Sequence, residues 1–249
     1  MLIDHRNKHV LVTGAGSGIG RACALKFAEC GAHVFVNDVN AVKAKEVAGE
    51  VDGTALPGDV ANPGDWLKPV LDVGVLHMVV HNAGYDLLTP MGSTDMAEFT
   101  RLHQVMVSGP YEMTQMLLPC LQKANGACVV FMASVHGLCT ERHMSAYASA
   151  KGAQIAMVRA LCLDMGEDKI RAVSIAPGYI DTPLIAAWVD STPDPAATRA
   201  HAASLHPMGR IGRPDEVAGL VAFLASSHAE FINGANVVID GGLIAQFAF

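Results

Sequence analysis

The sequence is poor in charged and in aromatic side chains. Of its 249 residues only 16% are charged and 6% aromatic, whereas 51% are hydrophobic. A chain this apolar can bury a large core, so the composition excludes an intrinsically disordered protein. At ~100–200 residues per domain, the length fits one large domain or two small ones.

The sequence also lacks an excess of basic residues. Lys and Arg number 17 and Asp and Glu number 24, which gives a formal net charge of −7. A net acidic chain has no electrostatic footprint for nucleic acid or for anionic lipid. No apolar run approaches the ~20 residues that a membrane-spanning helix needs. The composition therefore predicts a protein that binds neither nucleic acid nor membrane.

The N-terminal segment has no apolar core of the kind that a signal peptide needs. Asp4 and Arg6 bring charge into that position. The six cysteines form no Cys-x-x-Cys pair, and no histidine stands at zinc-finger spacing from them. We expect a cytoplasmic location, reduced and mostly buried thiols, and no catalytic metal.

Short apolar runs alternate with longer amphipathic segments along the chain. Because the runs are apolar on both sides, they fit parallel strands that helices cover on both faces. The alternation predicts an α/β fold with a doubly wound parallel sheet. The expected strands are residues 9–12, 33–37, 75–80, 127–132, 170–175 and 236–239, and the first two expected helices are residues 19–30 and 41–50.

Residues 181–207 interrupt this alternation. The segment contains Pro183, Pro193, Pro195 and Pro207 and has no clean periodicity. A long insertion near the carboxyl ends of strands is usually a functional lid. We therefore expect a loop that closes over a substrate; an inert surface loop is the alternative.

The first expected strand leads into a glycine-rich turn and then into a helix. The glycines fit the spacing Gly-x-x-x-Gly-x-Gly and not the common Gly-x-Gly-x-x-Gly register. Glycines let the backbone approach a pyrophosphate, and the helix N-terminus offers N–H donors and a positive dipole end. The turn predicts a dinucleotide site, with a ligand-free turn as the alternative. Its predicted binding residues are Gly14, Ser17, Gly18, Ile19 and Gly20.

Asp38 stands at the end of the second expected strand. A carboxylate there can accept hydrogen bonds from both hydroxyls of an adenosine ribose, and it would repel a 2′-phosphate. Residues 31–40 contain no Arg or Lys that would attract this phosphate. The sequence therefore favours NAD over NADP as the cofactor. Without the glycine turn upstream, Asp38 would be interpreted as a solvated turn residue.

Tyr147 and Lys151 are four residues apart, so on a helix they share one face. A tyrosine with an unperturbed pKa of ~10 is a poor general acid–base at neutral pH, and a nearby ammonium lowers that pKa. Ser134, at the end of an apolar run, could hold a substrate oxygen beside this tyrosine. A Tyr-x-x-x-Lys pair alone is common on exposed helices, and it gains weight here from the residues around it.

Nearly the whole chain resembles the short-chain dehydrogenase/reductase family. The motifs that match in family order and spacing are residues 13–20, Asp59-Val60, Asn82-Ala83-Gly84, Ser134, Tyr147, Lys151, Pro177-Gly178, Thr182, residues 209–218 and Asp240-Gly241-Gly242. The resemblance implies an NAD-dependent oxidoreductase with a single Rossmann-like domain over residues 1–249. It also implies a homotetramer, in which apolar tails such as residues 243–249 commonly pack between subunits.

The resemblance assigns roles in the interconversion of a secondary alcohol and its ketone. Tyr147 takes the hydroxyl proton while hydride passes to the nicotinamide, Ser134 orients the oxygen, and Lys151 keeps Tyr147 acidic and binds the nicotinamide ribose. The further cofactor contacts that it implies are Asp59 and Val60 at the adenine, Asn82, Ala83 and Gly84 along the cleft, and Pro177, Gly178, Ile180 and Thr182 around the nicotinamide.

Two residues depart from the family pattern. His81 replaces the first residue of Asn-Asn-Ala-Gly, which is mostly structural, so we expect a modest effect. Met106 stands where the family has a catalytic Asn that holds a water of the proton relay, and a methionine side chain cannot do this. A backbone carbonyl near Met106 could hold the water instead, whereas Gln104 and Ser108 lie on other faces of a regular helix. The alternative is a catalytically weakened dinucleotide-binding protein with a binding or regulatory role.

The substrate residues are less well defined. His136 resembles a residue of the 3-hydroxybutyrate dehydrogenases in this family, but Asp86 would repel a carboxylate. A neutral polyol or sugar-like alcohol is therefore at least as well supported as a small hydroxy acid. The predicted substrate contacts are Ser134, His136, Tyr147, Asp86 and Trp188. For Asp86 and His136, a solvated loop acid and a satisfied core histidine are equally favoured alternatives.

Overall fold

A computed structural model describes residues 3–246. Seven parallel strands form one sheet in the order β3-β2-β1-β4-β5-β6-β7. They are β1 (His9–Val12), β2 (His33–Asp38), β3 (Thr54–Pro57), β4 (Met78–His81), β5 (Ala127–Met132), β6 (Ile170–Pro177) and β7 (Asn236–Ile239). The predicted doubly wound α/β fold is confirmed. The strand expected from residue 75 begins three residues later, because the preceding helix ends at Gly74 in a left-handed conformation and a short connection follows.

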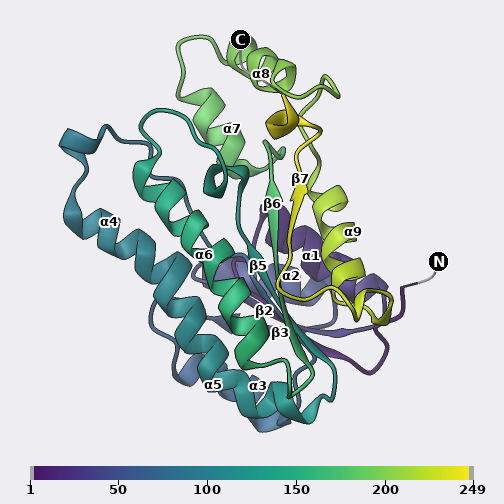
Figure 1. Ribbon diagram of the computed structural model, residues 1–249. Coiled ribbons are helices and arrows are strands. Elements are labelled where there is room, and N and C mark those ends of the chain that lie inside the picture. Colours follow the sequence, from purple (N-terminus) through teal and green to yellow (C-terminus); the bar gives the residue numbers. More distant parts are fainter. Residues whose placement is uncertain (1–2, 247–249) are drawn as a thin grey trace.

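Helices cover both faces of this sheet (Figure 1). One layer consists of α1 (Gly18–Glu29), α2 (Ala41–Glu50) and α9 (Pro214–Leu224), and the other of α3 (Lys68–Val73), α4 (Met96–His103), α5 (Gly109–Lys123) and α6 (Ser145–Asp164). Alternate strand residues point to the two layers. Val10 and Val12 pack in the core below the first layer, and Leu11 packs below the second. This two-sided burial explains why the strands are continuous apolar runs.

The segment around Met106, which the sequence analysis treats as a regular helix, is helical but distorted. Between α4 and α5 the chain forms a π turn over Gln104–Ser108. Pro110 has no N–H, so it cannot donate the hydrogen bond that the carbonyl of Met106 would accept in a regular α-helix. The distortion therefore lies in the segment where the sequence departs from the family pattern.

Residues 181–207 are not the irregular loop that the sequence predicts. They contain α7 (Pro183–Asp190) and α8 (Pro195–Ser204). Pro183 and Pro195 lie in the first turns of these helices, where a missing N–H is tolerated, and the side chains of Thr182 and Asp194 accept capping hydrogen bonds. The prolines that obscure the periodicity thus begin helices. Figure 1 shows both helices beyond the carboxyl ends of the strands.

Residues 3–246 can be searched for a membrane span, for a metal-binding cluster and for paired cysteines. Within residues 3–246, no helix combines the length and the apolar character needed to span a bilayer. The same residues contain no group of three or more His, Cys, Asp or Glu side chains placed to hold a metal. All six cysteines are free thiols, with Cys139 exposed. Phe247-Ala248-Phe249 of the apolar tail, which the sequence predicts at a subunit interface, lie outside the described residues.

Candidate active site

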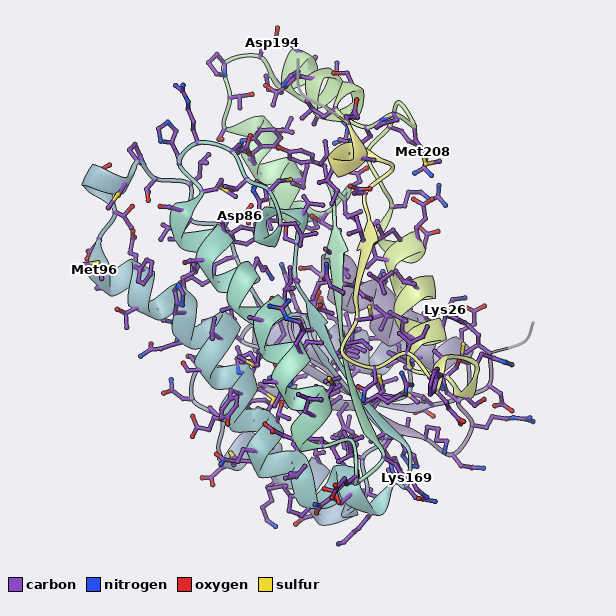
Figure 2. The ribbon with its side chains drawn as sticks, in the orientation of Figure 1. Lys26, Asp86, Met96, Lys169, Asp194 and Met208 are labelled. Atoms are coloured by element: carbon purple, nitrogen blue, oxygen red, sulfur yellow. The ribbon has the colours of Figure 1, made fainter. Side chains whose placement is uncertain are left out.

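The carboxyl ends of the strands open into a cleft of about 950 Å³. It lies where β1 and β4 are neighbours and the strand order reverses, which is where open α/β sheets bind ligands. Figure 2 shows Asp86 at this end of the molecule and Lys169 at the opposite end. The predicted residues that line the cleft are Gly14, Ser17, Gly18, Ile19, Asp38, Asp59, Val60, Asn82, Ala83, Gly84, Asp86, Ser134, His136, Tyr147, Lys151, Pro177, Gly178, Ile180, Thr182 and Trp188.

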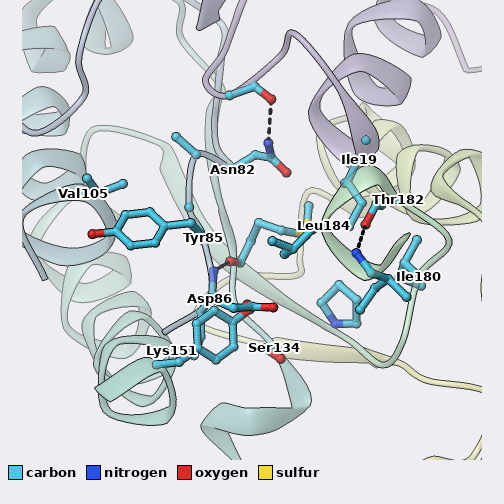
Figure 3. A pocket seen from close by; sticks show the side chains of 18 of the residues that line it. Ile19, Asn82, Tyr85, Asp86, Val105, Ser134, Lys151, Ile180, Thr182 and Leu184 are labelled. Atoms are coloured by element: carbon cyan, nitrogen blue, oxygen red, sulfur yellow. Dashed lines mark hydrogen bonds between the residues drawn. The ribbon is translucent and has the colours of Figure 1, made fainter. Parts of the chain in front are cut away.

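Gly20 is the predicted site residue that is not part of the cleft lining. A Cβ at this position would lie 2.2 Å from the carbonyl oxygen of Gly14, so it determines the shape of the turn instead. Gly14 itself has φ +60°, a left-handed conformation that favours glycine. Asn82 closes the turn from β4, because its Nδ2 donates to the carbonyl oxygens of Thr13 at 3.0 Å and Gly14 at 3.2 Å (Figure 3).

The glycine turn and the start of α1 form a cradle for an anion. α1 begins at Gly18, its N-cap Ser17 makes no side-chain capping hydrogen bond, and its first turn contains no acidic residue. The N–H groups of such a helix start and the positive end of its dipole attract negative charge. Because Ser17, Gly18 and Ile19 all line the cleft, the cradle fits the pyrophosphate of a dinucleotide.

Asp38 holds the glycine turn as well as lining the cleft. Its Oδ2 accepts from the backbone N–H of Gly16 at 2.9 Å, and its Oδ1 accepts from that of Asn40 at 2.8 Å. It is therefore more than a solvated turn residue. Lys43 of α2 also lies beside this turn, since a Cβ on Gly16 would lie 2.7 Å from the Cβ of Lys43. The sequence analysis considers only residues 31–40 as a source of a cation near Asp38, so it does not identify Lys43.

Ser134, Tyr147 and Lys151 come together at the cleft wall. Ser134 follows β5, and its Oγ accepts from the backbone N–H of His136 at 3.2 Å. Tyr147 and Lys151 project from the first turns of α6, and the Lys151 Nζ lies 5.4 Å from the centre of the Tyr147 ring. The Nζ donates to the carbonyl oxygen of Met132 at 2.6 Å. Ser134, Lys151 and Asp86 all line the cleft and are labelled in the same part of Figure 3.

The electrostatics of this group differ from the expectation. Burial lowers the pKa of Lys151 to about 8, and the negative charge of Asp86 opposes this effect. Burial and Asp86 both raise the pKa of Tyr147, and only a hydrogen bond with Ser134 lowers it. We expected the ammonium of Lys151 to lower the pKa of Tyr147. The ammonium does not determine the pKa of Tyr147, because desolvation has the larger effect and the ammonium donates to the carbonyl oxygen of Met132.

Two predicted substrate residues, His136 and Asp86, line the same part of the cleft as Tyr147. The His136 ring meets the Tyr147 ring edge-on, with centres 5.7 Å apart, and its Nδ1 is 3.0 Å from the Oγ1 of Thr140. Burial lowers the pKa of His136 and raises that of Asp86. Both side chains line the cleft rather than the core or the open surface. The structure therefore places them where a substrate could reach them.

The wall on the side of α7 contains residues that the sequence analysis does not identify. Trp188 stacks on Tyr179, with ring centres 5.7 Å apart and planes at 20°. The Tyr179 hydroxyl donates to Oε1 of Glu141 at 3.3 Å. The position of Tyr179 directly after the Pro177-Gly178 motif was an available signal. Nothing in the sequence marks Glu141, which comes from the connection between β5 and α6.

The chain is similar to known proteins over nearly its whole length. The family model described as enoyl-(acyl carrier protein) reductase matches residues 14–244. Cyclohexanol dehydrogenase from Acinetobacter sp. (strain SE19) is 35% identical in an alignment that is 254 positions long, gaps included, and that covers 96% of each chain. L-fucose dehydrogenase from Bos taurus is 36% identical over 244 residues, covering 96% of this chain and 90% of that one. The chain belongs to the short-chain dehydrogenase/reductase family.

A solved structure of the same family agrees with the fold. The crystal structure of 3-ketoacyl-(acyl-carrier-protein) reductase from Brucella melitensis, complexed with NADH, has a TM-score of 0.87 to this chain and 29% sequence identity. The match covers 96% of this chain and 99% of that one. The likeness therefore extends over the sheet and both helix layers.

Both departures from the family pattern are buried. His81 lies at the end of β4 with its Nε2 2.8 Å from the Oγ1 of Thr114, and burial lowers its pKa to about 3. The Met106 side chain is fully buried and packs against Gly84. A Cβ added to Gly84 would lie only 3.0 Å from the Cε of Met106. From the sequence, we expect that a backbone carbonyl near Met106 could hold a water. The carbonyl of Met106 itself accepts from Nε2 of Gln154 at 2.8 Å.

We expect Met106→Asn to destabilise the protein without improving catalysis. The replacement buries an amide in an apolar cluster, and an unsatisfied buried polar group costs about 1–3 kcal/mol. Met106→Leu is the control, because it keeps the volume and the apolar character. Thermal unfolding should show a lower Tm for the Asn variant than for the Leu variant. An Asn variant as stable as the parent, with faster turnover, would show that this pocket does provide polar partners.

Proposed function

We propose that this protein is an NAD-dependent oxidoreductase that interconverts a secondary alcohol and its ketone. The observation that carries the proposal is the convergence of Ser134, Tyr147 and Lys151 on a cleft that the glycine turn and Asp38 also line. The names of the relatives support it, since cyclohexanol is a secondary alcohol and L-fucose is a sugar. The NADH in the Brucella melitensis structure supports the cofactor.

The residues present fit NAD at each part of the cleft. The glycine turn would bind the pyrophosphate, and Asp38 would bind the adenosine ribose. Thr182 lies beside Gly18 and would contact the nicotinamide end of the cofactor. Asp59 and Val60 line the adenine side of this arrangement. When bound, NAD supplies the hydride acceptor. The protein contributes binding, orientation and control of the proton.

Three side chains would handle the substrate oxygen and its proton. Tyr147 takes the hydroxyl proton in oxidation and returns it in reduction. Ser134 donates a hydrogen bond to the substrate oxygen and holds it beside Tyr147. Lys151, with a pKa of about 8, is charged at neutral pH and favours the deprotonated form of Tyr147. Asp86 acts in the opposite sense, because its negative charge favours the protonated tyrosine.

The charge at the substrate end favours a neutral substrate. Asp86 and Glu141 both line the cleft, and their carboxylates would repel an anionic hydroxy acid. The stacked rings of Tyr179 and Trp188 supply an apolar wall for the carbon skeleton. We therefore favour a polyol, a sugar or a cyclic alcohol, covered by residues 181–207. A cytoplasmic location and a homotetramer stay predictions.

The activity can be tested with the purified protein. It would be incubated with NAD and with neutral secondary alcohols, polyols, sugars and 3-hydroxy acids, and NADH absorbance would be followed. We expect turnover with at least one neutral alcohol and little with the hydroxy acids. Tight NAD binding without turnover of any compound would contradict the proposed activity, and a preference for hydroxy acids would contradict the substrate class.

We expect the protein to bind NADH at least about tenfold more tightly than NADPH, a difference of ~1.4 kcal/mol. Asp38→Ala should narrow this gap, because it removes both the repulsion of a 2′-phosphate and the acceptor for the ribose hydroxyls. Asp38→Asn separates the two effects, since it removes the charge and keeps one side-chain acceptor. Both cofactors would be titrated by fluorescence. Equal or tighter binding of NADPH by the parent protein would contradict the role of Asp38.

A further inference from the structure

Gln154 is a buried polar residue without a place in the mechanism above. It lies three residues after Lys151 on α6, so the two side chains share one face of the helix. It is 1% exposed. Its Nε2 donates to the carbonyl oxygen of Met106 at 2.8 Å, whereas its Oε1 is buried and accepts no hydrogen bond from any residue in 3–246. A buried acceptor of this kind needs a donor.

Lys151 has the complementary requirement. Its ammonium has three N–H donors, and the side chain is nearly inaccessible, with 4% of the residue exposed. Among the described residues it donates only to the carbonyl oxygen of Met132. The titratable groups that face it are Tyr147 on its own helix and Asp86 from the segment after β4. Lys151 also lines the cleft, where its ammonium would donate a second N–H to the nicotinamide ribose. The third N–H needs an acceptor beyond these contacts.

The π turn explains why an amide occupies position 154. Because Pro110 has no N–H, the Met106 carbonyl lacks its α-helical donor, and the Nε2 of Gln154 replaces it. A side chain with donors alone would satisfy that carbonyl equally well. Glutamine also brings an acceptor, and it does so one helical turn from an ammonium that needs one.

We propose that Gln154 is a positioning residue that anchors a water molecule against the ammonium of Lys151. The water accepts an N–H of Lys151 and donates to the Oε1 of Gln154, so both buried groups are satisfied. It stabilises the charged form of Lys151 and thereby supports deprotonation of Tyr147. The glutamine amide thus performs, from α6, a task that the side chain of Met106 cannot perform. The catalytic consequence rests on the proposed dehydrogenase function, whereas the water site does not.

The water site can be tested without any substrate. A high-resolution crystal structure of the parent protein should show an ordered water within ~2.7–3.2 Å of both the Gln154 Oε1 and the Lys151 Nζ. A well-ordered map with no such water, or with Oε1 bonded to a protein donor, would overturn the proposal. This result is independent of whether an alcohol substrate is found.

The catalytic consequence can be tested with Gln154→Met, which keeps the length of the side chain and removes both polar atoms. Loss of the water removes a hydrogen bond to the charged form of Lys151, so the pKa of Lys151 falls and that of Tyr147 rises. Since oxidation needs the deprotonated tyrosine, the acid limb of kcat for alcohol oxidation should move to higher pH by about 0.5–1 unit. The measurement is kcat against pH for both proteins.

Thr114→Val is the control, because it removes other buried hydrogen bonds, those of the Thr114 hydroxyl with His81 and with the carbonyl oxygen of Pro110. Both variants should have a lower Tm, but only Gln154→Met should shift the pH profile. Equal profiles for all three proteins would show that Gln154 serves only to satisfy the Met106 carbonyl, and the proposal would be wrong. If the parent has no activity, the proposed function fails, and the crystallographic water still decides the role of Gln154.

Discussion

Tyr147→Phe is expected to lose nearly all turnover while still binding NAD. The substitution keeps the ring and deletes the hydroxyl that, in the proposed function, exchanges a proton with the substrate. General acid–base catalysis contributes typically ~10²–10⁴-fold, so kcat should fall by about that factor at every pH. Cofactor affinity should change little, because Lys151, the glycine turn and Asp38 are untouched. Steady-state kinetics and NADH titration measure the two properties separately.

Tyr179→Phe is the matched control for this loss. Its hydroxyl also lies in the cleft, but it donates to Glu141 and belongs to the wall on the side of α7. Removing it should change KM for the substrate and leave kcat within a few-fold of the parent value. If Tyr147→Phe retained near-normal turnover, or if Tyr179→Phe lost as much, the proton would have to pass through another residue.

Gly20→Ala is expected to weaken NAD binding more than tenfold and to destabilise the fold. Its Cβ would lie 2.2 Å from the carbonyl oxygen of Gly14, a backbone atom, and 2.5 Å from Nδ2 of Asn82. Hydrogen bonds to the carbonyl oxygens of Thr13 and Gly14 hold this Nδ2 in place. Overpacking costs typically ~1–3 kcal/mol, and at about 2–4 °C per kcal/mol for a domain of this size Tm should fall by several degrees. Because relief of the clash moves the anion cradle, NAD affinity should fall more than tenfold, or ~1.4 kcal/mol.

Gly219→Ala separates this effect from helix propensity. Gly219 lies inside α9, and a Cβ there would have no heavy atom within 4 Å. Alanine is favoured over glycine in a helix interior by ~0.8–1.0 kcal/mol, so this variant should have a higher Tm and normal NAD affinity. Calorimetry and cofactor titration of both variants are sufficient. A Gly20→Ala protein that binds NAD like the parent would show that the turn can relax without cost to the site.

Most of the fold could be predicted because its strands are buried on both sides. β4 and β5 are buried at every residue, so their sequences are continuous apolar runs that need no structural context to be identified. The insertion could not be predicted in the same way. Proline was interpreted as a sign of irregular structure, although Pro183 and Pro195 stand in first helical turns, where proline is favourable. Local composition does not distinguish these two uses of the residue.

The site could be predicted where its residues follow strands in short motifs. Ser134 after β5 and Asn82 after β4 are examples, because the end of a strand fixes both their position and their direction. Gln154 and Glu141 could not be found in this way. Gln154 is defined by its contact with the Met106 carbonyl, across 48 positions of sequence, and Glu141 by its contact with Tyr179. Such pairs exist only after the helices have packed.

The segment 181–207 has a consequence for the entropy of binding. Arg199 of α8 pairs at 2.6 Å with Asp181, which precedes α7. The hydroxyl of Thr198 in α8 lies 2.8 Å from that of Thr192, which follows α7, so α8 contacts the segments at both ends of α7. A flexible loop would lose roughly 1–2 kcal/mol of backbone freedom for each residue that it orders. Two helices that are already folded lose little backbone freedom on binding, so more of the contact energy contributes to affinity.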